Sequence, residues 1–350
     1  MDTLTHALSG ALLARAATPA RPAPGTPGVS GRMAAGFVGG AFPDIDVVTR
    51  AVDTLWYLSE VHQRATHSLV LLPLWAVAVA WLFGRASGLR WRGYFVPAAL
   101  GIGIHIAGDL ITAYGTMVLY PLSSWRPALS WTYVVDPYFT VILLAGLLAA
   151  WRWPTHAQTA AVAALAALVT YVGMLGLLHQ RAVGMAEAYA AAMELPAERG
   201  RALPQPFSPA HWMLVVSDGA AHHTAWARLL PGRSLAERLP LPPPFQRMPA
   251  HYSHAPEWQR HPRFGRTPDE IEVATEAWRQ DEFRYFRRFA RLPALHDVDA
   301  DGDDARQCAW FKDLRFSLPA LPPSFVFGMC RDTTDGTWQR KRRRGAMWFD

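Results

Sequence analysis

Two side chains that could share a metal ion stand four residues apart in an apolar stretch of this 350-residue chain. They are His105 and Asp109, within the apolar segment 94–112. Residues i and i+4 share one face of an α-helix, so the imidazole and the carboxylate can point at the same ion. Burying either group unpaired in hydrocarbon is costly, which makes ionisable residues there candidates for function. The alternative is a His–Asp hydrogen bond that satisfies both groups and holds a helical bundle together.

Further candidate ligands occur in the same apolar half of the chain, each near a predicted helix end. They are His6, Asp44, Asp46, His62 and His67, with Asp136 as an additional candidate. Neutral imidazole and carboxylate together suit zinc, manganese or ferrous iron, and neither cysteine lies in this half, which excludes a thiolate site. The set exceeds what one tetrahedral ion requires. We therefore expect one or two divalent ions, with zinc as the first choice, in an arrangement that suits two-metal hydrolysis of phosphoesters.

The residues around these candidates indicate individual roles. Pro43 ends a helix and could set Asp44 and Asp46 at its mouth, with only one of the two facing a given ion. A turn or helix cap is the alternative role for this pair. His67 is favoured over His62 as a ligand because it enters an apolar helix, although either could be a surface-loop histidine. Arg64 could pair with a phosphate or with a ligand carboxylate.

The composition divides the chain into an apolar half and a polar half. Residues 1–178 contain 10 arginines, no lysine and 7 acidic residues, whereas the rest hold the other 24 basic and 21 acidic residues. Each half has a net charge of +3, so the basic pI does not come from one concentrated patch. The basic run 340–344 is explained by a solvated tail, and no nucleic-acid-binding motif accompanies it. We therefore expect no nucleic-acid partner.

The predicted fold is mainly α, with a membrane-embedded helical bundle over residues 1–180 and a small soluble α+β domain over 181–350. The helices of the bundle are expected at 4–17, 33–42, 69–83, 94–112, 138–151 and 157–178. Segments 94–112 and 157–178 approach the ~20 residues needed to span a bilayer. Gly36, Gly39 and Gly40 would allow close helix packing around the site. Linker arginines favour the odd-numbered linkers as cytoplasmic by six to three, which places the candidate ligands and the C-terminal half outside the cytoplasm.

The polar half gives a weaker pattern. Residues 181–193 and 270–289 are expected to be helical, and 211–217 and 315–318 are strand-like. His222 and His223 lack accompanying acidic spacing, so they are expected to be core or exposed histidines. Cys308 and Cys330, the only cysteines, flank a Pro-rich loop in the half assigned outside the cytoplasm. A disulfide is therefore predicted, with two buried thiols as the alternative.

Taken together, the motifs of the first half resemble those of the YdjM family of membrane-bound metal-dependent hydrolases. The matching motifs lie within roughly residues 1–180 and are Met1-Asp2-x-x-x-His6, Gly40-x-x-Pro43-Asp44-x-Asp46, His62-Gln63-Arg64-Ala65-Thr66-His67-Ser68 and His105-x-x-x-Asp109. A more distant resemblance is to zinc-dependent phospholipase C and the P1 nucleases. By this resemblance His6, Asp44 or Asp46, His67, His105 and Asp109 would hold metal ions. The His-x-x-x-Glu pair that holds a further ion in those enzymes is absent from this sequence.

The resemblance implies a multi-pass hydrolase of the bacterial inner membrane, in contact with the lipid bilayer. It would act on a lipid or lipid-linked phosphoester through a metal-activated water. The predicted ligands are His6, Asp44, Asp46, His67, His105 and Asp109, and the predicted catalytic residues are Asp46 and Arg64. Two other functions use the same residues. A metal or proton transporter would need polar groups at mid-depth in several helices, and a non-catalytic scaffold would hold a structural metal while its soluble domain binds a partner.

Overall fold

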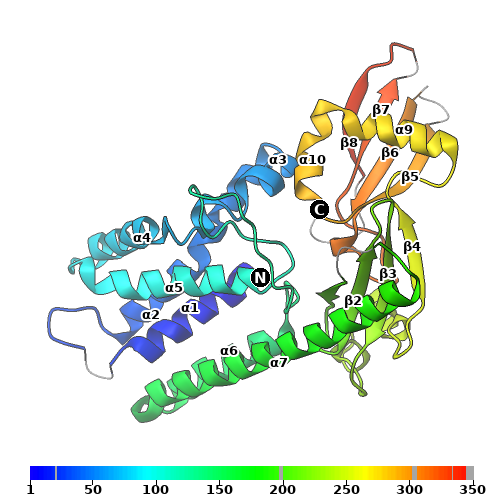
Figure 1. The fold of residues 1–350 in the computed structure, drawn as a ribbon. Coiled ribbons are helices and arrows are strands. Elements are labelled where there is room, and N and C mark those ends of the chain that lie inside the picture. Colours follow the sequence, from blue (N-terminus) through cyan, green and yellow to red (C-terminus); the bar gives the residue numbers. More distant parts are fainter. Residues whose placement is uncertain (20–21, 197–199, 302–305, 333, 344–350) are drawn as a thin grey trace. The chain divides into compact units, whose positions relative to one another are not determined.

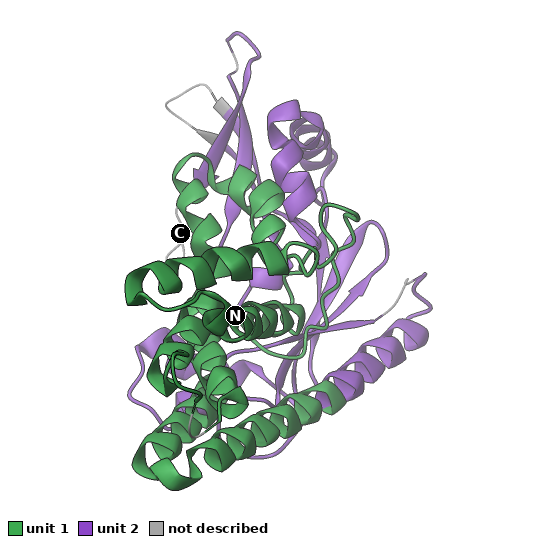
Figure 2. Ribbon diagram, turned by 90° about the vertical axis from the view of Figure 1, so that its left-hand side faces the viewer, with its two compact units in different colours: residues 1–177 green, residues 178–350 purple. Residues whose placement is uncertain are grey.

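The chain forms two compact units in the computed structural model, which describes all residues except 20–21, 197–199, 302–305, 333 and 344–350. Unit 1 covers Met1–Leu177 and unit 2 covers Leu178–Asp350 (Figure 2). The division falls close to the point where the composition changes from apolar to polar. Each unit is described separately below.

Unit 1 is helical, and each predicted apolar segment overlaps one of its longer helices, with ends that differ by up to four residues on most of them (Figure 1). These are α1 (Thr3–Ala17), α2 (Val29–Ala41), α4 (Leu72–Ser87), α5 (Arg92–Leu110), α6 (Pro137–Arg152) and α7 (Ala157–Ala192), whose last residues belong to unit 2. The link between α2 and α4 is made of short turns. They are η1 (Phe42–Ala51), α3 (Thr54–Trp56), the π-helical turn η2 (Tyr57–Val61) and η3 (Ala65–His67), and a further turn η4 (Pro154–His156) precedes α7.

Two helices of the described chain are long and apolar enough to cross a membrane. They are α5 and the continuous helical stretch Pro154–Ala192. A third candidate arises if Thr54–His67 and Leu72–Ser87, which are bent by 75° at their junction, count as one broken span. The two segments predicted to approach spanning length, 94–112 and 157–178, correspond to these two helices. The helix α6 is shorter, as predicted from the length of its apolar segment.

Small residues let α1, α2 and α5 approach closely in unit 1. A Cβ added at Gly36 of α2 would lie 2.5 Å from the carbonyl oxygen of Gly10 in α1. A Cβ at Gly39 would lie 2.5 Å from the carbonyl oxygen of Ala98 in α5. Real Cβ atoms cannot approach a backbone this closely, so glycine is required at both positions. This close packing brings the candidate ligands on α1 and α5 together.

Unit 2 contains two four-stranded antiparallel sheets, each with its strands in sequence order. The first consists of β1 (Arg201–Pro204), β2 (His211–Ser217), β3 (Ala221–Arg228) and β4 (Trp258–Pro262). The second consists of β5 (Pro293–Asp301), β6 (Arg306–Asp313), β7 (Val326–Asp332) and β8 (Trp338–Arg343). Besides the end of α7, this unit contains the helices α8 (Pro243–Arg247), α9 (Pro268–Arg279) and α10 (Arg284–Phe289). Its turns are η5 (Leu235–Glu237), η6 (Met248–His251), η7 (Asp281–Phe283) and η8 (Leu314–Phe316).

The predicted disulfide is confirmed. Cys308 of β6 and Cys330 of β7 are directly paired in the strand register and form a disulfide bond. Both are buried, in a cluster with Trp310 and Val326. The bond therefore links neighbouring strands inside the core of the second sheet.

Three predictions about unit 2 were wrong. The helix expected over 270–289 is broken at Gln280, whose backbone is extended, because Arg287 donates hydrogen bonds to the carbonyls of Trp278 and Gln280 at the end of α9. Residues 315–318 are not a strand, because Asp313 accepts a hydrogen bond from the Arg315 amide and caps the turn η8. Most of the basic run 340–344 is no tail but belongs to β8, which pairs with β7.

Candidate metal centre

His105 presents one defined nitrogen to the interior of unit 1. It lies on α5, is fully buried, and its Nδ1 is 2.6 Å from the carbonyl oxygen of Gly40 at the end of α2. A carbonyl can only accept a hydrogen bond, so Nδ1 carries the proton and Nε2 keeps a free lone pair. This is the arrangement in which proteins orient a metal-binding histidine.

His67 is oriented in the same way from the turn η3. Its Nδ1 lies 2.9 Å from the hydroxyl oxygen of Thr66, and that hydroxyl donates to Oδ2 of Asp46 at 3.3 Å. Because the hydroxyl proton is used on Asp46, the oxygen accepts the Nδ1 proton of His67. Nε2 of His67 is therefore also unprotonated.

The free nitrogens of these histidines and a carboxylate oxygen converge on one point. Nε2 of His67 and Nε2 of His105 are 3.0 Å apart, and Oδ2 of Asp109 lies 3.2 Å and 3.4 Å from them. Oδ1 of Asp44 lies 3.7 Å from His67 Nε2 and 3.6 Å from His105 Nε2. Zinc–ligand bonds of 2.0–2.1 Å place neighbouring tetrahedral ligands about 3.3–3.4 Å apart. The donor spacing fits one such ion.

The two oxygens of Asp109 have different partners. Oδ1 interacts with the Met1 amino group at 2.5 Å and with Nε2 of His6 at 3.1 Å. Oδ2 is buried, and no hydrogen-bond donor reaches it from the described part of the chain. An unpaired buried carboxylate oxygen facing two lone pairs is unfavourable without a cation. The residues present therefore fit a metal ion.

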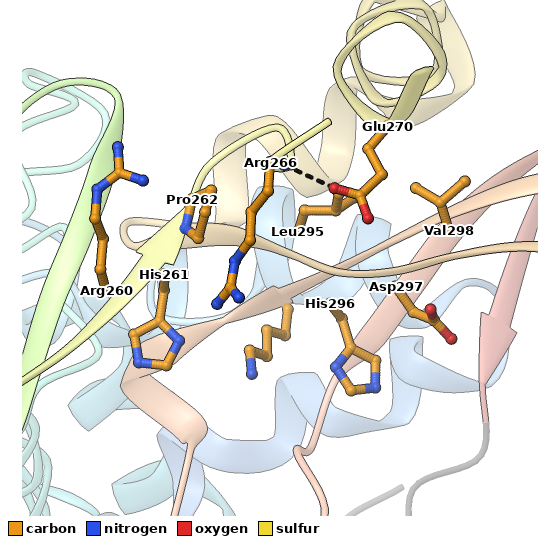
Figure 3. A pocket seen from close by; sticks show the side chains of 11 residues that line it. Arg260, His261, Pro262, Arg266, Glu270, Leu295, His296, Asp297 and Val298 are labelled. Atoms are coloured by element: carbon orange, nitrogen blue, oxygen red, sulfur yellow. Dashed lines mark hydrogen bonds between the residues drawn. The ribbon is translucent and has the colours of Figure 1, made fainter. Parts of the chain in front are cut away.

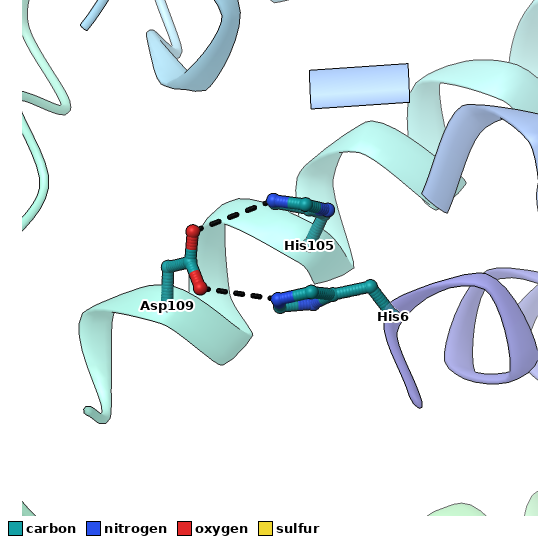
Figure 4. Close-up of side chains that lie close together, drawn as sticks. All are labelled: His6, His105 and Asp109. Carbon is teal, nitrogen blue, oxygen red and sulfur yellow. Dashed lines mark hydrogen bonds and ion pairs between the residues drawn. The ribbon is translucent and has the colours of Figure 1, made fainter. Parts of the chain in front are cut away.

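His6 reaches the centre from α1. Its ring stacks on that of His105, with 3.7 Å between ring centres, and Figure 4 shows the two imidazoles on opposite oxygens of the Asp109 carboxylate. His6, His105 and Asp109 form one buried group whose donor atoms lie within 4.8 Å of one another. A Cβ at Gly108 would lie 2.9 Å from Cε1 of His6, so glycine at this position leaves room for the ring.

A second group of donors consists of Asp44, His62 and His67. Here Asp46 occupies a different place from Asp44. Its carboxylate faces Nδ1 of His62 at 3.2 Å and 3.3 Å, while Asp44 faces the Nε2 atoms of the central histidines. The predicted division between the two aspartates is therefore present: Asp44 faces the donors, and Asp46 orients His62 and, through Thr66, His67.

The centre is closed on one side and partly open on the other. The side chains of His67, His105 and Asp109 are at most 2% exposed, whereas those of Asp44 and His62 are 14% and 17% exposed. The Thr3 hydroxyl donates a hydrogen bond of 2.6 Å to Oδ2 of Asp44, which leaves Oδ1 facing the two histidines. Asp44 is therefore the carboxylate at the accessible side of the donor cluster.

Two other candidates lie in different settings. Arg64 forms an ion pair with Glu60 at 2.9 Å. Asp136 caps α6 by accepting from the amides of Tyr138 and Phe139, and it also accepts from the hydroxyl of Tyr171 at 2.8 Å. It thus has the role of a helix cap.

Sequence reasoning missed the groups that orient the ligands. Thr66 was noted only as a neighbour of His67, and Gly40 only as a small residue, yet they hold Nδ1 of His67 and of His105. Tyr57, whose hydroxyl lies 3.0 Å from Nδ1 of His62, was not considered. Of these orienting groups, only the threonine could have been suspected from the sequence, because it directly precedes His67 in the His-x-x-x-Thr-His motif.

These features define a membrane-type helical protein with a buried histidine–aspartate centre that could hold a metal ion. Over residues 1–182 the chain matches the family described as YdjM inner membrane protein, and it belongs to that family. "Uncharacterized protein YfhP" of Bacillus subtilis (strain 168) is 30% identical over 156 residues. That match covers 43% of this chain and 46% of the relative, less than half the length of either. No solved structure matches the chain. The resemblance to phospholipase C and the P1 nucleases stays a prediction.

Proposed function

We propose that this protein is a membrane-bound metal-dependent hydrolase that acts on a lipid or lipid-linked phosphoester. The observation that carries the proposal is the convergence of Nε2 of His67, Nε2 of His105 and Oδ2 of Asp109, with Oδ1 of Asp44 beside them. Membership of an inner membrane family supports the location, and the histidine and carboxylate donors suit zinc, with manganese or iron as alternatives.

The chain's own residues divide the work. His67, His105, Asp109 and Asp44 would hold the cation. Because the donors form two groups of three, one of which contains His6 and the other His62, they could hold one or two ions. A bound divalent cation supplies Lewis acidity and lowers the pKa of a coordinated water. Asp46, predicted as both ligand and catalytic residue, fixes the orientation of His62 and His67. Arg64 would leave its ion pair with Glu60 and bind the substrate phosphate instead, because a guanidinium can form two parallel hydrogen bonds with either a carboxylate or a phosphate.

An apolar substrate is supported by the segment that carries Asp44. The turn η1 and the residue after it expose Ile45, Val47, Val48 and Val52, which are 54%, 48%, 68% and 80% exposed. Soluble surfaces rarely expose large aliphatic side chains in such a group. These residues lie next in sequence to the partly exposed ligand. They would contact acyl chains at the place where the phosphoester reaches the centre.

The proposed topology has several membrane crossings and an extracytoplasmic C-terminal half. The Cys308–Cys330 disulfide supports this orientation, since disulfides persist in oxidising compartments and are rare in the cytosol. Alkylation and mass spectrometry of protein from native membranes provides a test. Two free thiols would contradict the orientation, whereas a mass consistent with one disulfide would agree with it.

The deciding experiment measures metal and hydrolysis on the same protein. The full chain, purified in detergent without chelator, should contain one or two zinc, manganese or iron ions per chain by elemental analysis. It should also hydrolyse a short-chain phospholipid. His105→Ala and Asp109→Asn should lose both properties, while Asp136→Asn, which changes a buried aspartate outside the centre, should keep both. Wild-type protein with metal but no hydrolysis of any phosphoester would favour a structural metal, and protein without metal would contradict the proposal outright.

A further inference from the structure

Unit 2 contains a polar cavity where its two sheets meet. The cavity has a volume of about 350 Å³ and lies between β4 and β5. A backbone hydrogen bond of 3.1 Å from Leu295 in β5 to the carbonyl of Arg263, just after β4, connects the two walls. The volume is within the range of cavities that bind small molecules.

Basic side chains dominate this cavity. Arg260, Arg266 and Lys312 line it together with His261 and His296. Figure 3 shows the Arg266 side chain reaching down from the loop after β4, between His261 and His296. Burial lowers the pKa of Lys312 and, with the neighbouring Lys312 charge, lowers that of His261 to about 4. Burial and the Lys312 charge also lower the pKa of His296, so both imidazoles are neutral hydrogen-bonding groups among the positive charges.

Two carboxylates, those of Glu270 and Asp297, also line the cavity, and each has a bonding partner of its own. Glu270 accepts hydrogen bonds from the backbone amides of Arg266 and Thr267, as the cap of α9. Asp297 forms an ion pair with Arg343 at 3.1 Å. Among the described residues, no acidic side chain lies within ion-pair distance of Arg260, Arg266 or Lys312. The cavity therefore has three cationic groups against two carboxylates, and both carboxylates are bonded to other groups of the chain.

A second cavity adjoins the first at two shared lining residues. It has a volume of about 270 Å³ and shares His261 and Lys312 with the first cavity, while its other lining residues include Trp226, Leu318 and Leu321. The shared residues make the two cavities neighbouring lobes, one cationic and one partly apolar. A ligand that spans both must combine an anionic group with an apolar group.

We propose that this two-lobed cavity binds a phosphate monoester with an apolar substituent. The phosphate would lie among Arg260, Arg266 and Lys312, and the substituent would extend past His261 towards Trp226, Leu318 and Leu321. A phosphate dianion matches three cations better than a carboxylate does, and arginine binds phosphate oxygens through two parallel hydrogen bonds. The proposal does not depend on the metal centre in unit 1, and it assigns a ligand to a unit for which the family match gives none.

Binding is measured by calorimetry on the full, metal-loaded chain in a nonionic detergent, and any binding at the metal centre is taken from the signal that remains when Arg266→Gln and Lys312→Gln are combined. The probes are hexyl phosphate, inorganic phosphate and hexanol. Hexyl phosphate should bind more tightly than inorganic phosphate, and hexanol should not bind measurably. Arg266→Gln and Lys312→Gln should each weaken hexyl phosphate binding by about tenfold or more, as expected for the loss of a hydrogen bond to a charged group.

Matched variants separate the two lobes. Arg279→Gln, an exposed change at the end of α9, should leave binding unchanged. Leu321→Ser should reduce the advantage of hexyl phosphate over inorganic phosphate without changing the affinity for inorganic phosphate. Equal binding of the two phosphates would overturn the apolar part of the proposal. Absence of saturable binding, or binding unaffected by both cation variants, would overturn it entirely.

The source of the phosphate is identified in lipid nanodiscs. If the ligand is a membrane lipid, phosphatidic acid in a phosphatidylcholine disc should compete with hexyl phosphate, and phosphatidylcholine alone should not. If the ligand is a soluble phosphate ester, hexyl phosphate should bind equally in both discs. Each result supports the phosphate site and assigns its ligand to one of the two sources.

Discussion

The proton positions on two histidines decide whether the centre in unit 1 can accept a cation. The Gly40 carbonyl accepts a hydrogen bond from Nδ1 of His105. The Thr66 hydroxyl, which donates to Asp46, accepts one from Nδ1 of His67. Both Nε2 lone pairs then face the unpartnered Oδ2 of Asp109. The chemistry of this centre thus depends on residues that would not touch the metal.

Asp46 should therefore act through the histidines that it orients. Asp46→Asn removes the negative charge that orders His62 and the Thr66 hydroxyl, and metal affinity should fall about 10- to 100-fold. Competition with a fluorescent zinc chelator measures this. Asp53→Asn is the control, because asparagine replaces aspartate well as the N-cap of α3. An affinity of Asp46→Asn equal to that of the wild type would show that Asp46 has no such role.

The space for His6 gives a second prediction at single-residue scale. In Gly108→Ala the new Cβ would lie 2.9 Å from the His6 ring and displace it, so metal affinity or stoichiometry should fall. Gly103→Ala on the same helix places its Cβ 3.7 Å from Leu72, an ordinary contact, and controls for the helix-propensity change. Elemental analysis of both variants provides the measurement. Equal metal content in both would mean that His6 contributes nothing to the centre.

The sequence located the donors better than it located their orientation. The spacing of His105 and Asp109 on a helix already places them on one face, which the structure shows. Asp44 and Asp46 could not be told apart, because η1 is a 3-10 segment whose side-chain directions follow from the chain around it. The Gly40 carbonyl could not be found from sequence, since any residue type carries a carbonyl.

At the scale of elements, apolar patterning predicted the helices of unit 1 well and the ends of elements in unit 2 poorly. An uninterrupted apolar segment of this length directly predicts a helix that is buried in protein or lipid. No glycine or proline marks the break at Gln280 in the sequence. The helix ends there because Arg287, from the next helix, donates hydrogen bonds to the carbonyls of Trp278 and Gln280. Similarly, β8 forms a strand although its sequence is basic, because its backbone pairs with that of β7. The side chain of Arg343 also forms ion pairs with Asp297 and Asp299.

Helix packing around the centre should be sensitive to a single methyl group. Gly36→Ala would place its Cβ 2.5 Å from both the Gly10 carbonyl and the Ala14 side chain, and this overpacking should destabilise the protein by about 1–3 kcal/mol. Gly31→Ala, also on α2, meets the Tyr94 ring at 3.4 Å and Pro27 at 3.8 Å, which are ordinary contacts, and is the control. Thermal unfolding in detergent compares the two. A Gly36→Ala protein as stable as Gly31→Ala would contradict the tight α1–α2 contact.

For the whole molecule, stability should decrease in mild acid through the histidines of unit 2. Burial and then the nearby Arg228 charge lower the pKa of His211, which stacks on Tyr252, to about 4. A folded-state pKa below the unfolded value of about 6.5 means that stability is complete above pH 6.5 and falls as the pH drops towards 4. The loss is about 3 kcal/mol for this residue, at about 1.4 kcal/mol per unit.

Chemical unfolding of the full chain between pH 7 and pH 4 measures this loss. In His211→Gln the slope of stability against pH should be smaller than in the wild type, because the titrating group is gone. The exposed His254 offers the matched variant, and His254→Gln should keep the wild-type slope. Identical slopes in all three proteins would show that His211 does not titrate on unfolding.

The proposed ligands His6, Asp44, His67 and Asp109 come from four separate segments, spread over more than 100 positions of the chain. A cation held by all of them ties α1, η1, η3 and α5 together, so it would bind the folded chain and not the unfolded one. The amount of this protein in a cell would then follow the supply of the metal. In metal-starved cells, newly made chains should be degraded faster, and the same treatment should not change the half-life of Asp109→Asn. Pulse-chase labelling would detect this difference even if the substrate were never identified.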